Sequence, residues 1–158
     1  MAAVTLGDLF HIGFRVADLS VAMEEYGEAL GASWALPAEI PDQSLWTPDA
    51  GLQFLPLRFV YSIEGPVHIE LVSGPEGCIW DGTGDSGIHH VGMWVGDISA
   101  RVRSLQESGA TLMAAARAPS EGFGNYAYLK IPAVGVIELV SLDVRPRMEA
   151  WWAGAAFV

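Results

Sequence analysis

An internal repeat is the feature that most constrains the fold of this chain. The segment His-Ile-Gly-Phe-Arg-Val-Ala-Asp begins at His11, and it returns 79 positions later as His-Val-Gly-Met-Trp-Val-Gly-Asp, which begins at His90. A second pair of segments, residues 67–73 and 136–141, shares Ile-Glu-Leu-Val-Ser. Two diverged copies of one pattern predict a fold built by duplication, in which both halves have the same order of elements.

Each copy of the pattern is followed by a predicted helix. Apolar residues recur at helical spacing at Leu19, Met23, Tyr26 and Leu30, and again at Ile98, Val102 and Leu105. Asp18 and Asp97 stand where N-caps belong, and Gly31 and Gly109 stand where the helices should end. Both halves are therefore predicted to begin with a strand and a helix.

Further strands complete each half. Residues 52–62 supply one strand in the first half, and residues 111–118 and 126–132 supply two in the second. Residues 36–49, with three prolines and three acidic residues, predict a long loop. The expected fold class is α+β, with a strand, a helix and about three strands in each half.

Strand alternation places the repeated histidines on one face. Successive side chains of a strand point to opposite faces. The face opposite the apolar residues carries two equivalent sets, His11, Gly13 and Arg15 in the first strand and His90, Gly92 and Trp94 in the second. The adjacent His89 falls on the packing face, so we expect it to be a half-buried neighbour of His90.

Each closing strand carries a glutamate within an apolar run. Glu70 shares its face with His68, and Glu138 holds the equivalent position in the second half. A carboxylate there is costly unless it is paired or bound to a metal. Taken singly, such residues are usually a hydrogen-bonded core histidine or a solvated glutamate. Together, one histidine and one glutamate from each half predict a shared site for one divalent ion, either Ni, Co, Zn, Mn or Fe.

Composition limits the partners. Of 158 residues 51% are hydrophobic, the net charge is -11, and the eight basic residues are scattered, which argues against binding to nucleic acid. No apolar run is long enough for a membrane span, and the N-terminus lacks the features of a signal peptide. The single cysteine, Cys78, excludes an internal disulfide and fits a cytoplasmic protein. A neutral or weakly charged, partly apolar small molecule is the expected ligand.

The repeated histidines and glutamates resemble those of the vicinal oxygen chelate superfamily, from Phe10 to Leu142. The resemblance implies two βαβββ modules, at about 8–75 and 87–143, whose mixed sheets curl around a metal-binding cup. Residues 1–158 would form one such domain, with a C-terminal arm at 144–158. The four residues matching the metal ligands of bacterial glyoxalase I are His11, Glu70, His90 and Glu138.

The resemblance also implies a reaction. It predicts a metal-dependent isomerase or lyase, commonly a homodimer, that moves a proton at a carbon next to a carbonyl. Glu138 is the first candidate for proton transfer and Glu70 the second. Methylmalonyl-CoA epimerases carry a further acid on the third strand, which is missing from residues 52–62, and glutathione-binding features are not evident. Two alternatives stay open, an extradiol-type dioxygenase with Fe(II) and a metal-free drug-binding protein of the bleomycin-resistance type.

Three residues are candidates for substrate binding, Arg15, Trp94 and His68. Arg15 would meet a substrate carboxylate, or else form a surface salt bridge. Trp94 is expected to line the cup, with four further tryptophans nearby, Trp46, Trp80, Trp151 and Trp152. Two indoles in the cup would indicate an apolar substrate larger than methylglyoxal. Residues 148–158 are expected to form a short helix or arm that covers a cleft or a subunit interface.

Overall fold

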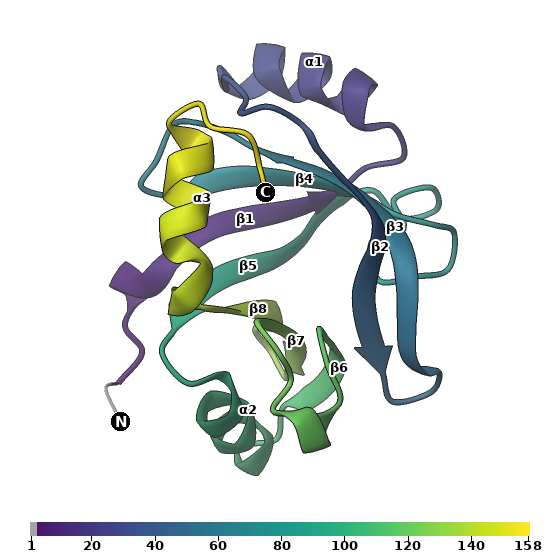
Figure 1. The fold of residues 1–158 in the computed structure, drawn as a ribbon, viewed down its shortest axis with the longest axis vertical. Helices are drawn as coiled ribbons and strands as arrows, with labels where there is room; N and C mark the ends of the chain where they lie inside the picture. Colours follow the sequence, from purple (N-terminus) through teal and green to yellow (C-terminus); the bar gives the residue numbers. More distant parts are fainter. Residues whose placement is uncertain (1–2) are drawn as a thin grey trace.

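A computed structural model describes residues 3–158, and its elements follow the predicted duplicated order (Figure 1). The first half contains β1 (Leu9–Arg15), α1 (Leu19–Leu30), β2 (Ala38–Thr47), β3 (Gly51–Tyr61) and β4 (His68–Ser73). The second half contains β5 (Gly87–Val95), α2 (Ile98–Glu107), β6 (Thr111–Ala115), β7 (Tyr126–Ile131) and β8 (Gly135–Ser141), and α3 (Arg145–Trp152) follows it. The α+β class with two tandem βαβββ modules is confirmed.

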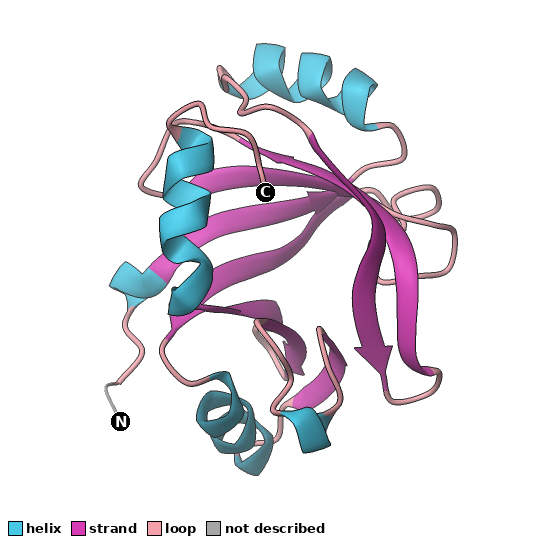
Figure 2. Ribbon diagram, viewed as in Figure 1, coloured by secondary structure: helices cyan, strands magenta, loops and turns pink. Residues whose placement is uncertain are grey.

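The strands form one strongly curled mixed sheet. Their order is β1-β4-β3-β2-β6-β7-β8-β5, and the sheet closes on itself. In each half the first strand pairs in parallel with the last, and antiparallel pairing of β1 with β5 joins the halves. On the other side β2 meets β6 through a single pair, Trp46 with Ala115. Figure 2 shows the hollow side of the sheet, with α1 and α2 outside it and α3 in front of the strands.

Both early helices have the predicted caps. The Asp18 side chain accepts a hydrogen bond from the backbone N–H of Val21, and Asp97 does the same for Ala100. Gly31 ends α1 in the left-handed conformation, with φ of 70°. The predicted stripe of α1 is wrong at its last residue, because the final turn extends beyond the packed surface and leaves Leu30 57% exposed.

The predicted loop at residues 36–49 is wrong, because most of it is strand β2. It pairs with β3 from Ala38 to Thr47, and the register shifts between Ile40 and Gln43. Pro41 lies within that irregularity, where a residue without an N–H does not break the ladder. The other two prolines flank the strand. This strand completes the βαβββ order of the first half.

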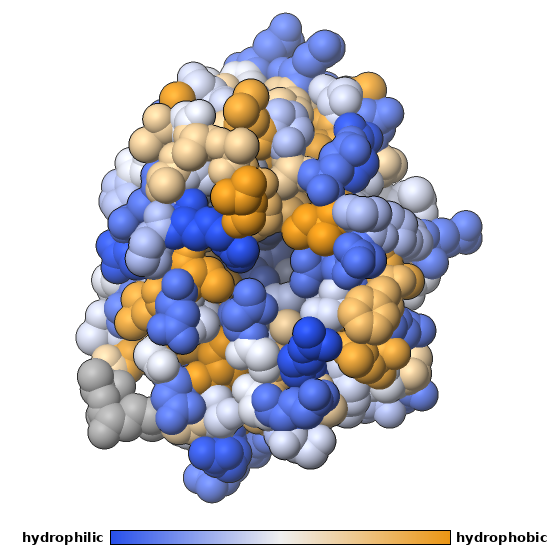
Figure 3. Space-filling view, in the orientation of Figure 1, coloured by the Kyte–Doolittle hydropathy of each residue, from blue (hydrophilic) through white to orange (hydrophobic). Residues whose placement is uncertain are grey.

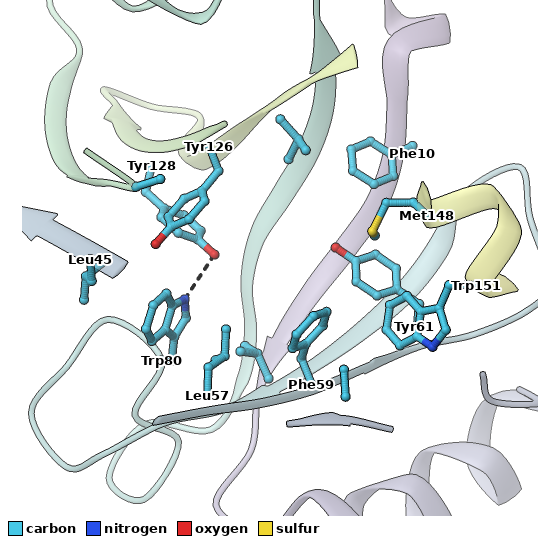
Figure 4. Packing of buried hydrophobic residues seen from close by; sticks show 14 of the residues in the cluster. Phe10, Leu45, Leu57, Phe59, Tyr61, Trp80, Tyr126, Tyr128, Met148 and Trp151 are labelled. Atoms are coloured by element: carbon cyan, nitrogen blue, oxygen red, sulfur yellow. Dashed lines mark hydrogen bonds between the residues drawn. The ribbon is translucent and has the colours of Figure 1, made fainter. Parts of the chain in front are cut away.

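Aromatic side chains fill much of the hollow side of the sheet, and Figure 4 shows ten labelled residues of this cluster. Trp151 of α3 is fully buried there, and its Nε1 donates a hydrogen bond to the Leu36 carbonyl at 2.8 Å. The helix is thus fixed to the inner core. Within residues 3–158, no helix is both long and apolar enough to cross a membrane.

Candidate metal centre

The four predicted ligands converge from four neighbouring strands. His11 lies on β1, Glu70 on β4, His90 on β5 and Glu138 on β8. All four are buried, and one donor atom from each lies within 4.8 Å of all the others. All four side chains therefore come together within one chain.

Two glycines allow the histidines to approach. In the register of β1 and β5, Gly13 pairs with His90 and His11 pairs with Gly92. A Cβ on Gly13 would lie 2.0 Å from Cε1 of His90, and a Cβ on Gly92 would lie 1.8 Å from Cε1 of His11. Each imidazole therefore occupies the space that the glycine of the other half leaves free.

The distances between donor atoms fit one ion. The two Nε2 atoms of His11 and His90 are 2.9 Å apart, and the four contacts of these nitrogens with Oε2 of Glu70 and Glu138 measure 3.0 to 3.3 Å. Two ligand atoms that each lie ~2.0–2.1 Å from a zinc-like ion are ~2.9 Å apart when their bonds to the ion form a right angle, and ~3.3 Å apart when the coordination is tetrahedral. Oε2 of Glu138 also lacks a well-aligned hydrogen bond although it is buried. The donor set fits a divalent metal.

Without a metal, the four groups form buried ion pairs. Burial alone would lower the pKa of His90, but contacts with Glu138 and Glu70 outweigh it and raise the pKa to about 9. The pKa of His11 is raised in the same way. Burial would raise the pKa of both glutamates, yet the two imidazoles hold it below its usual range. Metal ions must therefore compete with protons for this site.

His89 supports the ligand next to it. Its Nδ1 lies 3.0 Å from Nδ1 of His90, and its ring is half-buried, as predicted. Burial first, and then the charge on His90, lowers the pKa of His89 to about 4, so the ring is neutral near pH 7. A neutral His89 can accept the Nδ1–H of His90 and leave Nε2 of His90 free for a metal.

A cavity of about 470 Å³ opens above the two carboxylates. Glu70 and Glu138 line it, whereas the two imidazoles lie behind them, 0% and 2% exposed. Figure 3 shows a hollow near the centre of the face that is viewed in Figure 1. A small molecule in the cavity would therefore meet the carboxylates directly.

Two tyrosines that the sequence analysis missed lie beside the carboxylates. Tyr61 on β3 pairs in register with Glu70, and Tyr128 on β7 pairs in register with Glu138. Both line the cavity, and burial first and the nearby carboxylates second raise their pKa well above 10. Nε1 of Trp80 donates to the Tyr128 hydroxyl at 3.2 Å (Figure 4). The repeated Tyr–Glu pairing depends on strand register, which the sequence did not reveal.

The three candidate substrate-binding residues lie away from this cavity. Arg15 pairs with Asp85 at 3.1 Å, which is the salt-bridge alternative. Trp94 is buried and stacks on Phe10 at 3.7 Å. His68 is buried too, and its Nδ1 lies 2.6 Å from the Ser62 carbonyl oxygen. Strand alternation predicted that these residues share a face with the candidate ligands. An ion pair holds Arg15, however, and aromatic neighbours cover Trp94 and His68.

The tryptophans contribute less to the cavity than expected. Of the six, Trp80 lines it, while Trp151 supports it from the buried side of α3. Trp152 stacks on His68, and Trp46 packs toward the core beneath α2. Two indoles in the cup were the expected sign of an apolar substrate larger than methylglyoxal, whereas among residues 3–158 the indole of Trp80 alone lines this cavity. The apolar walls come mainly from Leu57, Phe59, Val72, Trp80 and Met148.

The fold class is that of duplicated βαβββ units that surround two buried histidines and two buried glutamates, which could hold a metal ion. The sequence family described as the Glyoxalase/Bleomycin resistance protein/Dioxygenase superfamily matches residues 10–128. The chain belongs to this superfamily, as the resemblance predicted. A search of curated proteins found no match.

Solved structures share the fold. A hypothetical protein from Bacillus halodurans C-125 is 19% identical with a TM-score of 0.60, over 84% of this chain and 92% of that one. Methylmalonyl-CoA epimerase from Mycobacterium tuberculosis is 24% identical with a TM-score of 0.57, over 89% and 91%. The Streptomyces coelicolor epimerase (E43Q) in complex with 2-nitronate-propionyl-CoA is 16% identical with a TM-score of 0.55, over 88% and 98%. At these identities the likeness defines the fold.

Proposed function

We propose that this protein is a metal-dependent isomerase or lyase that moves a proton at a carbon next to a carbonyl. The observation that carries the proposal is the convergence of two imidazoles and two carboxylates at the base of a cavity. Four buried ligands in one chain are more than a structural ion pair needs. The substrate is proposed to be a fairly apolar small molecule, since much of the wall is aliphatic and aromatic.

His11, His90, Glu70 and Glu138 would hold the ion. A divalent ion bound there would act as a Lewis acid and stabilise the negative charge that develops on a carbonyl oxygen when the adjacent C–H proton leaves. Glu138 and Glu70 face the cavity, so either carboxylate can take a proton from bound substrate and return it. The histidines lie behind them and serve as ligands.

Proton transfer in this cavity depends on few groups. Among residues 3–158, the acidic residues that line the cavity are Glu70 and Glu138 alone. The third strand β3, which carries no acid, contributes the Tyr61 phenol instead. A carboxylate that takes the proton and a phenol that donates a hydrogen bond to the substrate oxygen are therefore proposed as the working pair.

Related structures support a carbonyl substrate. One methylmalonyl-CoA epimerase of the same fold was solved in complex with methylmalonyl-CoA and NH4+. That ligand is a thioester, and an epimerase inverts a carbon centre. We carry over only the class of chemistry, because the acid of the third strand is absent here.

The first test is the metal content. The protein is purified without chelator or metal affinity resin and is measured by elemental analysis, beside Glu138→Gln and an exposed control, Glu107→Gln. We expect about one equivalent of a divalent metal in the parent and the control, and at least tenfold weaker binding in Glu138→Gln. Absence of metal, with no uptake on reconstitution, would refute the proposal.

The second test detects proton transfer without a known substrate. The metal-loaded protein is incubated in deuterium oxide with a panel of ketones, ketoacids and thioesters, and exchange at the carbon next to the carbonyl is followed by NMR. We expect exchange in at least one compound, with a loss of roughly a hundredfold or more in Glu138→Gln. Exchange that is equal in the variant would exclude Glu138 as the base.

Two further measurements separate the competing functions. Fe(II) dioxygenases use two histidines and one carboxylate, so the second glutamate here would occupy a position that oxygen or catechol needs. Oxygen uptake with a catechol panel after iron loading would favour that chemistry. Tight ligand binding by a protein that takes up no metal would favour a sequestering role.

A further inference from the structure

Two arginines line the cavity in a strongly acidic chain. The sequence has 8 basic and 19 acidic residues, yet Arg117 and Arg147 both border this space. Within residues 3–158, the acids at the cavity are the two metal-ligand candidates, Glu70 and Glu138. The charges are therefore sorted, with carboxylates at the base and guanidinium groups at exposed positions. Figure 3 shows strongly hydrophilic groups at the edge of the hollow.

No acidic side chain pairs with either guanidinium. Arg15, Arg58 and Arg145 each pair with a carboxylate side chain, whereas Arg117 and Arg147 pair with no Asp or Glu side chain among residues 3–158. Nη1 of Arg147 donates one hydrogen bond, to the Val158 backbone oxygen at 3.3 Å. The donor groups of Arg117 and the remaining donors of Arg147 are available to an anion, and a guanidinium group matches a carboxylate in a bidentate geometry.

Local structure holds both arginines at the cavity. The backbone N–H of Arg117 donates to the Phe123 carbonyl at 2.9 Å, and Phe123 is buried with φ of 70°. A bulky residue in the left-handed region is held there by its surroundings, and such backbone is common at binding sites. Arg147 stands on α3, with its guanidinium 4.7 Å from the Phe157 ring centre. Both side chains thus start from fixed backbone positions.

We propose that the substrate is an organic acid with an apolar body, whose carboxylate is bound by Arg117 and Arg147. The inference rests on the proposed function, because the reacting carbonyl lies at the Glu70 and Glu138 end of the same cavity. The same cavity is also lined by Leu57, Phe59 and Trp80, which give it an apolar wall. A molecule that carries an anionic group, an apolar body and a carbonyl would match these three kinds of lining.

A single anionic group fits better than several phosphates. The net charge of -11 repels a polyanion, and two guanidinium groups suffice for one carboxylate. A cavity of about 470 Å³ also suits a drug-sized molecule rather than a complete coenzyme A thioester.

The test compares an acid with its neutral isostere. Binding of 2-naphthoate, 2-naphthamide and 2-naphthyl phosphate to the metal-free protein is measured by calorimetry, so that the acid cannot bind to a metal. We expect the acid to bind at least tenfold more tightly than the amide, because charged hydrogen bonds exceed neutral ones. Equal affinity for acid and amide would overturn the proposal. A phosphate that binds more than tenfold tighter than the acid would overturn the choice of a carboxylate.

Substitution of the two arginines tests where the carboxylate binds. Arg117→Gln and Arg147→Gln should each weaken 2-naphthoate about fivefold to tenfold and leave 2-naphthamide unchanged. Arg147→Lys keeps the charge but loses the bidentate donors, so its affinity should fall between those of Arg147→Gln and the parent. Arg103→Gln is the matched control, because Arg103 is also exposed and unpaired but lies on α2 and does not line the cavity. If Arg103→Gln loses as much affinity for 2-naphthoate as Arg117→Gln and Arg147→Gln, the assignment of the carboxylate site to Arg117 and Arg147 is contradicted. If the protein takes up no metal but still binds the acid more tightly than the amide in an arginine-dependent way, the proposed function is refuted and the anion site is not.

Discussion

At the scale of single residues, the site depends on reciprocal packing between histidine and glycine. Gly13 and Gly92 have no side chain because the imidazole of the other half lies against each of them. The glycines were visible in the repeat, but the sequence indicated only that they leave room beside the ligands. Which ring fills which space depends on the register of β1 against β5, and that register is a tertiary property.

Adding a methyl group at either glycine should move a ligand. We expect Gly92→Ala to displace the His11 ring, to weaken metal binding at least tenfold and to destabilise the fold by about 1–3 kcal/mol through overpacking. Metal titration and urea unfolding measure the two effects. Gly84→Ala is the control, since a Cβ at Gly84 meets no atom within 4 Å. Unchanged metal affinity in Gly92→Ala would show that the ring can adjust.

The raised pKa of His90 predicts a dependence on pH. Protonated His90 stabilises the metal-free fold through Glu138 and Glu70, so this contribution is complete below the unfolded pKa of 6.5 and is lost as pH rises through about 9. Metal uptake near pH 7 should therefore release at least one proton and should strengthen as pH rises. An indicator dye in weak buffer measures the release. Metal binding without proton release would mean that His90 is already neutral.

At the scale of elements, α3 is held mainly by one residue. Trp151 is fully buried against Phe59 and Tyr61 and is bonded to the Leu36 carbonyl. We expect Trp151→Ala to lower the free energy of unfolding by about 3–5 kcal/mol, whereas Leu30→Ala, at an exposed position of α1, should change it by less than about 0.5 kcal/mol. Chemical denaturation gives both values. A small effect of Trp151→Ala would mean that the helix does not depend on this anchor.

Elements with a strong local sequence signal were predictable. Elements that depend on pairing with a neighbouring strand were not. Caps and periodicity indicated α1 and α2 to within a residue or two, and the closing strands were evident from Ile-Glu-Leu-Val-Ser. Strand β2 was missed because three prolines and three acids suggest a loop when its ladder with β3 is not known. The candidate ligands could be predicted because strand alternation puts one histidine and one glutamate of each copy on the same face. Tyr61, Tyr128, Arg117 and Arg147 could not be predicted in this way. Their positions at the cavity depend on strand pairing and on loop geometry.

At the scale of the whole molecule, one chain supplies every candidate ligand. The superfamily resemblance led us to expect a homodimer, but His11, Glu70, His90 and Glu138 come together within one chain, so the proposed metal site would not need a second chain. We therefore expect one metal ion per chain whether the protein is a monomer or a dimer. Light scattering with elemental analysis over a range of concentrations checks this. A metal content that falls as the protein dissociates would show that a second chain contributes to the site.

The crossing of the two histidines also bears on ancestry. Each βαβββ unit contributes one histidine, one glutamate and one glycine to the site, and its imidazole lies over the glycine of the other unit. A half-length ancestor would thus have had to bind its metal between two identical copies. After gene fusion, a change at Gly13 would select for a change at His90, and one at Gly92 for a change at His11. The two halves of this chain are bound to co-evolve across the duplication rather than within each copy.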